Sequence, residues 1–168
     1  ECLRIERLSQ KLMQLLVLKQ DGELELTRAS VSALLESVRA SAAELLKQRG
    51  LTLEIQNELD TLLMEPDLLA NLLINLIDNA GKASPPGSTI AIIARENTIA
   101  VVDHGCGMPK DELDKITQPF YRIDRSRARK AVGIGLGLAL AEDIARLHLA
   151  RLEFESEPGA GTTVKVVF

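Results

Sequence analysis

The chain has 168 residues, of which 46% are hydrophobic and 26% charged, and its mean hydropathy is +0.07. These values predict one globular domain with an ordinary hydrophobic core. The formal net charge of −4 argues against a surface devoted to nucleic acid or anionic lipid. Aromatic residues make up only 2% of the chain and tryptophan is absent, which excludes a base-stacking platform for single-stranded nucleic acid.

Two further features bear on cellular location. Cys2 and Cys106 are far apart, without a CxxC motif or a histidine at ligand spacing, which favours reduced thiols over a disulfide or a zinc site. No stretch approaches the ~20 consecutive apolar residues of a membrane helix, and the first residues lack the pattern of a secretory signal. Because the first residue is not Met, we expect a cytoplasmic fragment of a longer protein, with any plasma-membrane anchor outside it.

The first predicted element is a helix over residues 1–20, whose apolar residues Ile5, Leu8, Leu12 and Leu15 recur at a 3-4-3 spacing. This spacing is typical of the seam of a coiled coil or helical bundle, although an amphipathic helix folded onto its own domain has the same pattern. Residues 21–22 break the helix, and residues 23–27 alternate as a half-buried strand does.

The next predicted elements are helices separated by pairs of strands. Helical periodicity predicts a helix over 31–49, with Ser30 as its N-cap and Gly50 as its terminator. The next predicted elements are short strands over 51–55 and 61–64 joined by a polar turn, an apolar helix over 68–82 opened by Pro66, and a hairpin of strands over 89–94 and 98–102. The last predicted elements are a short helix over 109–116, a basic irregular segment over 120–132, a helix over 138–147, and closing strands over 151–156 and 162–167.

Asn75, Asn79 and Lys82 form the first cluster that could carry chemistry. Their spacing puts them on one face of the predicted apolar helix. Buried amides need hydrogen-bond partners, and a divalent cation with phosphate oxygens would use amide oxygens and a nearby ammonium group. The alternative is that the amides bond to the neighbouring backbone, which is the favoured interpretation for Asn71.

Asp103 ends a predicted strand and is followed by Gly105 and Gly107. Glycines let the backbone approach a flat ligand closely, and the carboxylate could accept a hydrogen bond from an exocyclic amine such as that of adenine. An Asx turn at the end of the strand is the alternative.

A glycine-rich segment, GIGLGL over residues 133–138, lies at a loop-to-helix junction, where backbone amides favour phosphate. A Rossmann GxGxxG motif and a P-loop are both excluded, since Leu138 stands at the third glycine position and no GxxxxGK[ST] occurs. The loop before it is either a solvated surface loop or a lid that closes over a triphosphate. Its basic residues are Arg122, Arg125, Arg127, Arg129 and Lys130.

Four motifs, taken in this order, resemble the catalytic and ATP-binding domain of the sensor histidine kinases of two-component systems, in the superfamily of gyrase, Hsp90, histidine kinase and MutL. NLIDNAGK (75–82) resembles the N box, DHGCGM (103–108) the first glycine box, PFYR (119–122) the F box and GIGLGLAL (133–140) the second glycine box. For residues 21–168 the resemblance implies an α/β fold, a two-layer sandwich of a mixed sheet with helices on one face (the Bergerat-type ATP-binding fold). Residues 1–20 resemble the end of the second dimerisation helix.

The resemblance also implies roles for individual residues. Asn79 would ligate a Mg²⁺ ion that bridges the ATP phosphates, and Asp103 would accept a hydrogen bond from the adenine amine. The implied catalytic residues are Asn75, Asn79, Lys82, Arg122 and Arg127. The implied nucleotide-binding residues are Asn79, Lys82, Asp103, Gly105, Gly107, Met108, Ile116, Tyr121, Gly133, Gly135, Leu136, Gly137, Thr162 and Thr163.

One position favours phosphoryl transfer over hydrolysis. The ATP-hydrolysing members of the superfamily place a glutamate base four residues before the metal-binding Asn, where this chain has Asn75. The resemblance therefore implies a protein-histidine kinase that transfers the γ-phosphoryl group of ATP to a histidine on a helix absent from this chain, in its own or a partner subunit of a homodimer. The phosphoryl group would then pass to an aspartate of a response regulator.

His104 and His148 lack the acidic neighbour that follows a phosphoacceptor histidine, so neither is expected to be the acceptor. A serine kinase of the anti-sigma-factor type and a nucleotide-binding module without transfer activity remain alternatives. Val132 and Leu149 depart from the family pattern, in which glycine is common at both positions.

Overall fold

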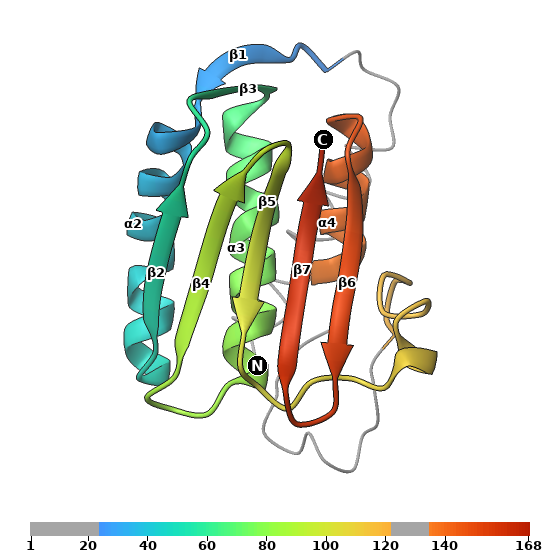
Figure 1. Cartoon of the computed structure of the whole chain (residues 1–168). Coiled ribbons are helices and arrows are strands. Elements are labelled where there is room, and N and C mark those ends of the chain that lie inside the picture. The colour runs from blue at the N-terminus through green and yellow to red at the C-terminus, as the bar shows by residue number, and fades with distance from the viewer. Residues whose placement is uncertain (1–23, 122–134) are drawn as a thin grey trace, which may run out of the picture.

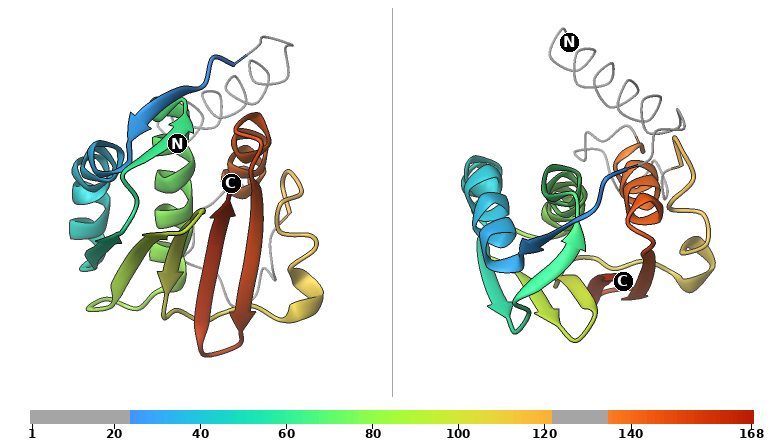
Figure 2. Two further views of the ribbon diagram at one scale, coloured as in Figure 1. Left: turned by 45° about the horizontal axis from the view of Figure 1, so that its top comes forward. Right: turned by 90° about the horizontal axis from the view of Figure 1, so that it is seen from above.

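The computed structural model describes residues 24–121 and 135–168. In this part of the chain, a five-stranded sheet with the strand order β2-β4-β5-β7-β6 forms one layer, and the helices α2, α3 and α4 form a second layer on one face of it (Figures 1 and 2). The two-layer mixed α/β arrangement predicted from the motifs is confirmed. The helix predicted over residues 1–20 lies outside the described residues.

The bounds of the elements are as follows: β1 Thr27–Ser30, α2 Val31–Arg49, β2 Thr52–Asn57, β3 Thr61–Met64, α3 Pro66–Ala83, β4 Thr89–Arg95, β5 Thr98–Asp103, the 3₁₀ helix η1 Lys110–Glu112, α4 Gly137–Leu147, β6 Arg151–Glu157 and β7 Gly161–Val167.

Helix α2 has the predicted bounds because both of its ends are capped. At its start the Ser30 hydroxyl oxygen accepts a hydrogen bond from the Ala33 N–H at 3.3 Å. At its end Gly50 adopts the left-handed conformation (φ 65°) and donates its N–H to carbonyl groups of the last turn. The apolar stripe between these caps, which includes Leu35 and Val38, is buried.

Helix α3 lies between α2 and α4 in the helix layer (Figure 2). The Glu65 carboxylate caps its N-terminus, accepting hydrogen bonds from the N–H groups of Asp67 and Leu68, and Pro66 occupies the first turn. Its central apolar residues are completely buried, namely Leu69, Leu72, Leu73 and Ile77. Helix α3 is therefore the centre of the hydrophobic core, and its polar residues stand out against that background.

The sheet is mixed. Strand β2 runs parallel to β4, whereas the pairs β4–β5, β5–β7 and β7–β6 are antiparallel. The predicted hairpin of β4 and β5 is confirmed. The strands β2 and β3, predicted as neighbours joined by a polar turn, do not pair with each other, because β3 pairs with β1 in a separate two-stranded sheet.

The strand predicted over 23–27 is shifted: β1 begins at Thr27 and pairs with β3 from Thr27↔Met64 to Ser30↔Thr61. In this register the residue before Thr27 would oppose Glu65, which caps α3, so the ladder ends there. The helix predicted over 109–116 is also wrong, since only Lys110–Glu112 form a 3₁₀ turn, followed by further turns. A segment this short gains too few hydrogen bonds to sustain an α-helix.

Among the described residues, no helix has both the length and the apolar character needed to cross a membrane.

Candidate functional site

The amide groups of α3 face the start of α4. Asn75 is buried, with 8% of its surface exposed, and its Nδ2 donates a hydrogen bond to the Asn71 carbonyl oxygen at 3.0 Å. The Asn79 Nδ2 is buried and has no hydrogen-bond partner among residues 24–121 and 135–168. Buried amides in folded proteins are nearly always paired, so this donor is available to a hydrogen-bond acceptor outside these residues.

Gly137 is the first residue of α4 and lies directly beside both amides. A Cβ placed on Gly137 would lie 3.5 Å from the Asn75 Oδ1 and 3.6 Å from the Asn79 Nδ2. The predicted N box and second glycine box are thus in contact, and the N-terminus of α4, which attracts anions, lies over the asparagine face of α3.

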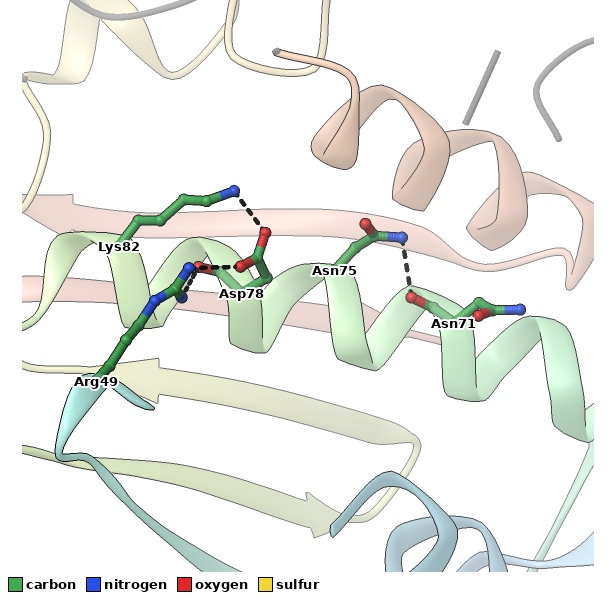
Figure 3. A network of polar contacts seen from close by, with 5 residues as sticks. All are labelled: Arg49, Asn71, Asn75, Asp78 and Lys82. Atoms are coloured by element: carbon green, nitrogen blue, oxygen red, sulfur yellow. Dashed lines mark hydrogen bonds and ion pairs between the residues drawn. The ribbon is translucent and has the colours of Figure 1, made fainter. Parts of the chain in front are cut away.

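Lys82 lies three residues beyond Asn79 on α3 and is bound by an acidic residue one helical turn before it. Its Nζ is 2.5 Å from the Asp78 Oδ2, while the Asp78 Oδ1 accepts a hydrogen bond from the Arg49 guanidinium at 2.9 Å (Figure 3). Burial raises the pKa of Asp78, but the charges and hydrogen bonds of Lys82 and Arg49 outweigh it and hold that pKa below its ordinary value.

Asp78 and Arg49 were not expected to take part in this site. The spacing of Asp78 and Lys82, one helical turn apart, is a signal from which their ion pair could have been predicted. No local signal connects Arg49 to Asp78, because the two residues are 29 positions apart and meet only through the packing of α2 on α3.

Asp103 is buried at the end of β5, with 6% of its surface exposed. Its Oδ1 accepts a hydrogen bond from the Gly105 N–H at 2.8 Å, so the Asx turn considered as the alternative is present. Burial raises the pKa of Asp103, although backbone hydrogen bonds from Gly105 and Thr162 and the charge of His104 act in the opposite direction.

The two glycines after Asp103 have a packing role, which is separate from the predicted approach to a ligand. A Cβ on Gly105 would lie 2.5 Å from the Ala83 carbonyl oxygen, and one on Gly107 would lie 1.9 Å from that of Glu157. Glycine is therefore required at both positions for the loop to pack against the end of α3 and the β6–β7 turn, whether or not a ligand approaches it.

Ser156 forms hydrogen bonds that fix the loop after β5, and no sequence pattern predicted this role. The Ser156 Oγ accepts a hydrogen bond from the Met108 N–H at 2.8 Å and lies 2.9 Å from the Thr162 Oγ1. Thr162 is buried and pairs with Asp103 across the β5–β7 ladder. Thr163, the next residue on β7, points to the opposite face of the sheet, because side chains alternate along a strand.

The remaining predicted residues lie around the F box. Ile116 and Leu136 are both buried. The Tyr121 hydroxyl donates a hydrogen bond to the Glu112 carboxylate, and this bond is the main cause that raises the pKa of Tyr121. Gly135 packs against this segment, since its carbonyl oxygen accepts a hydrogen bond from the Phe120 N–H at 2.9 Å. The predicted residues outside the described part of the chain are Arg122, Arg127 and Gly133.

The sequence of this chain matches a known protein family. Residues 64–168 match the family described as histidine kinase-, DNA gyrase B- and HSP90-like ATPase. Because this match covers more than half of the chain, the chain belongs to that family, and the resemblance stated from the four motifs is confirmed.

Relatives of this chain are named as sensor kinases. It is 38% identical over 122 residues to the adaptive-response sensory kinase SasA of Synechococcus elongatus, a match that covers 70% of this chain and 31% of SasA. It is 33% identical over 109 residues to the signal transduction histidine-protein kinase ArlS of Staphylococcus aureus, covering 62% of this chain and 24% of ArlS. The chain thus matches about a third or less of the length of these relatives.

Solved structures support the fold. The cytoplasmic segment of the histidine kinase QseC superposes with a TM-score of 0.69 at 23% identity, covering 98% of this chain and 93% of that one. The Acinetobacter baumannii histidine kinase AdeS superposes with a TM-score of 0.71 at 23% identity, covering 96% of this chain and 77% of that one. This chain therefore has the fold of the catalytic part of histidine kinases.

Proposed function

We propose that this chain is the ATP-binding kinase core of a two-component sensor histidine kinase. In this proposal it binds ATP with Mg²⁺ and presents the γ-phosphoryl group to a histidine on a helix outside this chain. Residues 21–168 would be the catalytic domain, and residues 1–20 the end of the second dimerisation helix.

The buried Asn79 Nδ2, which has no partner among the described residues, is the observation that carries the proposal, because a phosphate oxygen is an acceptor that would pair with this donor. Among the described residues no group of three or more His, Cys, Asp or Glu side chains could hold a metal ion. A Mg²⁺ ion would bind the Asn79 Oδ1 together with phosphate oxygens, and oxygen ligands suit this ion. When bound, Mg²⁺ would withdraw negative charge from the phosphates.

Other residues would orient the nucleotide. The N-terminus of α4 at Gly137, beside the two asparagines, would face the phosphates. Lys82 would supply a positive charge at the phosphate end, and Asp103 would read the adenine amine within a loop held by Ser156. Catalysis of this kind consists mainly of positioning and charge stabilisation.

The acidic residues of α3 favour transfer over hydrolysis. A hydrolytic base must accept a proton from water, which the neutral amide of Asn75 does not do at neutral pH. Asp78 is a poor base because its pKa is lowered and its Oδ1 is held by Arg49. Asp67, the other acidic residue of α3, lies in its first turn, far along the helix from Asn79.

The contacts of His148 support an external acceptor. His148 is 4% exposed, with its Nδ1 2.8 Å from the Ile144 carbonyl oxygen and its Nε2 accepting a hydrogen bond from the Glu65 N–H at 3.1 Å. It is a structural link between α4 and the start of α3. In the proposal, an imidazole nitrogen of another helix bonds to the γ-phosphorus as the bond to the β,γ-bridging oxygen breaks, and ADP leaves. A response regulator would receive the phosphoryl group next.

The test of this proposal combines binding and transfer. Asn79→Ala should weaken MgATP binding, measured by calorimetry, by at least about tenfold and should abolish transfer of labelled phosphate to a supplied histidine-bearing helix. Asn71→Ala is the matched control, because Asn71 lies two turns earlier on α3 and contributes its backbone carbonyl, which the substitution keeps.

The label identifies the reaction. Phosphohistidine is acid-labile, so loss of the label in acid is expected. An acid-stable label would indicate the serine kinase, and ATP binding without any transfer would indicate a nucleotide-binding module. Transfer retained at the wild-type rate by Asn79→Ala would contradict the role given to Asn79.

A further inference from the structure

Arg49, at the end of α2, contacts the lysine of the proposed phosphate site through one shared carboxylate. We propose that Arg49 is a positioning residue that sets how readily Lys82 can turn to the nucleotide phosphates, by keeping Asp78 paired when Lys82 leaves it. This inference rests on the proposed function, since it concerns the same site.

The two cations use different atoms of Asp78. The Arg49 Nη2 is 2.9 Å from the Asp78 Oδ1, and the Lys82 Nζ is 2.5 Å from the Asp78 Oδ2 (Figure 3). Lys82 can therefore exchange its partner without disturbing the bond between Arg49 and Asp78. A carboxylate with only one cation would instead be left unpaired by the same movement.

Arg49 is held more firmly than Lys82. Its Nη1 donates a second hydrogen bond, at 3.0 Å, to the Asp78 backbone carbonyl oxygen. The guanidinium therefore bonds to both the side chain and the main chain of Asp78. Its guanidinium also lies against Gly81, where a Cβ would approach the Arg49 Nη1 to 2.7 Å. Lys82, by contrast, is a flexible chain with a compact charge.

The ion pairs of Asp78 are partly buried, so the loss of a partner affects its energy. The side chains of Arg49, Asp78 and Lys82 are 30%, 19% and 23% exposed, so water screens their charges only in part. Without Arg49, an Asp78 carboxylate that lost Lys82 would be a partly buried, unpaired charge near the phosphates. Its burial without a partner and its repulsion from the phosphates would both be unfavourable. With Arg49 in place, the cost of moving Lys82 toward a phosphate is lower.

The experiment measures the affinity of the chain for MgATP and for adenosine by calorimetry. Arg49→Met should weaken MgATP binding about fivefold, a moderate effect for a partly exposed charge-assisted contact, and should leave adenosine binding unchanged because adenosine has no phosphates. Arg49→Lys should recover part of the loss. Arg39→Met is the matched control, since Arg39 lies on the same helix and pairs with the exposed Glu36.

A double substitution tests whether Arg49 acts through Lys82. In the Lys82→Met background there is no partner exchange for Arg49 to assist, so Arg49→Met should cause no more than about a twofold further loss, from the repulsion between the unpaired Asp78 and the phosphates. Equal losses for MgATP and adenosine, or fully additive losses for MgATP, would overturn the inference and indicate a general structural role. If Lys82→Met itself leaves MgATP binding unchanged, the role of Lys82 in the proposed function fails instead.

Discussion

Leu149 adopts a backbone conformation that suits glycine, and replacing it should stabilise the fold. Its φ is +56°, in the left-handed region, and it directly follows the C-cap His148 of α4. The Leu149 N–H bonds to the Arg146 carbonyl oxygen at 3.0 Å and the Ala150 N–H to that of Ala145 at 2.9 Å. These two bonds form a Schellman motif, in which the residue at this position is usually glycine.

The size of the effect follows from this geometry. A non-glycine residue in the left-handed conformation costs about 1–2 kcal/mol. The Leu149 side chain is 87% exposed, so its removal loses little packing. Glycine is more flexible in the unfolded chain, which offsets part of the gain. We expect Leu149→Gly to raise the free energy of unfolding by about 1 kcal/mol and the melting temperature by about 3 °C.

Urea unfolding is the assay, and Leu149→Ala is the matched control. Alanine removes the exposed apolar side chain but keeps the Cβ and therefore the backbone strain. If Leu149→Gly is no more stable than Leu149→Ala, strain at this position is not the cause, and the reasoning is wrong. MgATP affinity should be the same in both variants, since Leu149 follows α4 at the end opposite to Gly137.

Two further predictions concern the loop after β5. Gly107→Ala should destabilise the fold by about 3 kcal/mol or more in urea unfolding, because its Cβ would lie 1.9 Å from the Glu157 carbonyl oxygen. Gly87→Ala is the control: Gly87 is also at positive φ, but a Cβ there would have nothing within 4 Å, so this substitution should destabilise the fold much less. Burial raises the pKa of Asp103, so its carboxyl group holds a proton more tightly in the folded state than in the unfolded state. The free energy of unfolding should therefore fall as the pH rises from 3.8 through the raised pKa. Asp103→Asn should remove this pH dependence of the unfolding free energy and weaken MgATP binding, and an unchanged pH profile would contradict the assignment.

Local signals predicted most elements of the fold. The caps of α2, Ser30 and Gly50, act within one helical turn of the residues that they bond, so a short stretch of sequence contains the whole signal. The hairpin of β4 and β5 is equally local, since its strands are separated by two residues. The helix predicted over 109–116 is wrong because a short helical pattern does not show whether so short a helix is stable.

The site was predictable where its motifs are contiguous. Asn75, Asn79 and Lys82 occupy one helix face, and their order along the chain is enough to bring them together. Ser156 and Arg49 were missed because each acts on a residue far away in the sequence, at separations of 48 and 29 positions. No pattern near either residue distinguishes it from an ordinary surface or strand position.

Spacing along single elements was enough to predict the approximate positions of α2, α3 and α4 and the shared helix face of Asn75, Asn79 and Lys82, and the resemblance of four ordered motifs to a known family was enough to predict the class of domain. The pairing of the strands depended on the folded chain, because β2 and β3 can each satisfy their backbone hydrogen bonds with several partners and the burial of the whole sheet selects one arrangement. The folded chain also placed Gly137 over the asparagines and Arg49 beside Asp78. Such contacts between distant segments arise from packing, which no local pattern records.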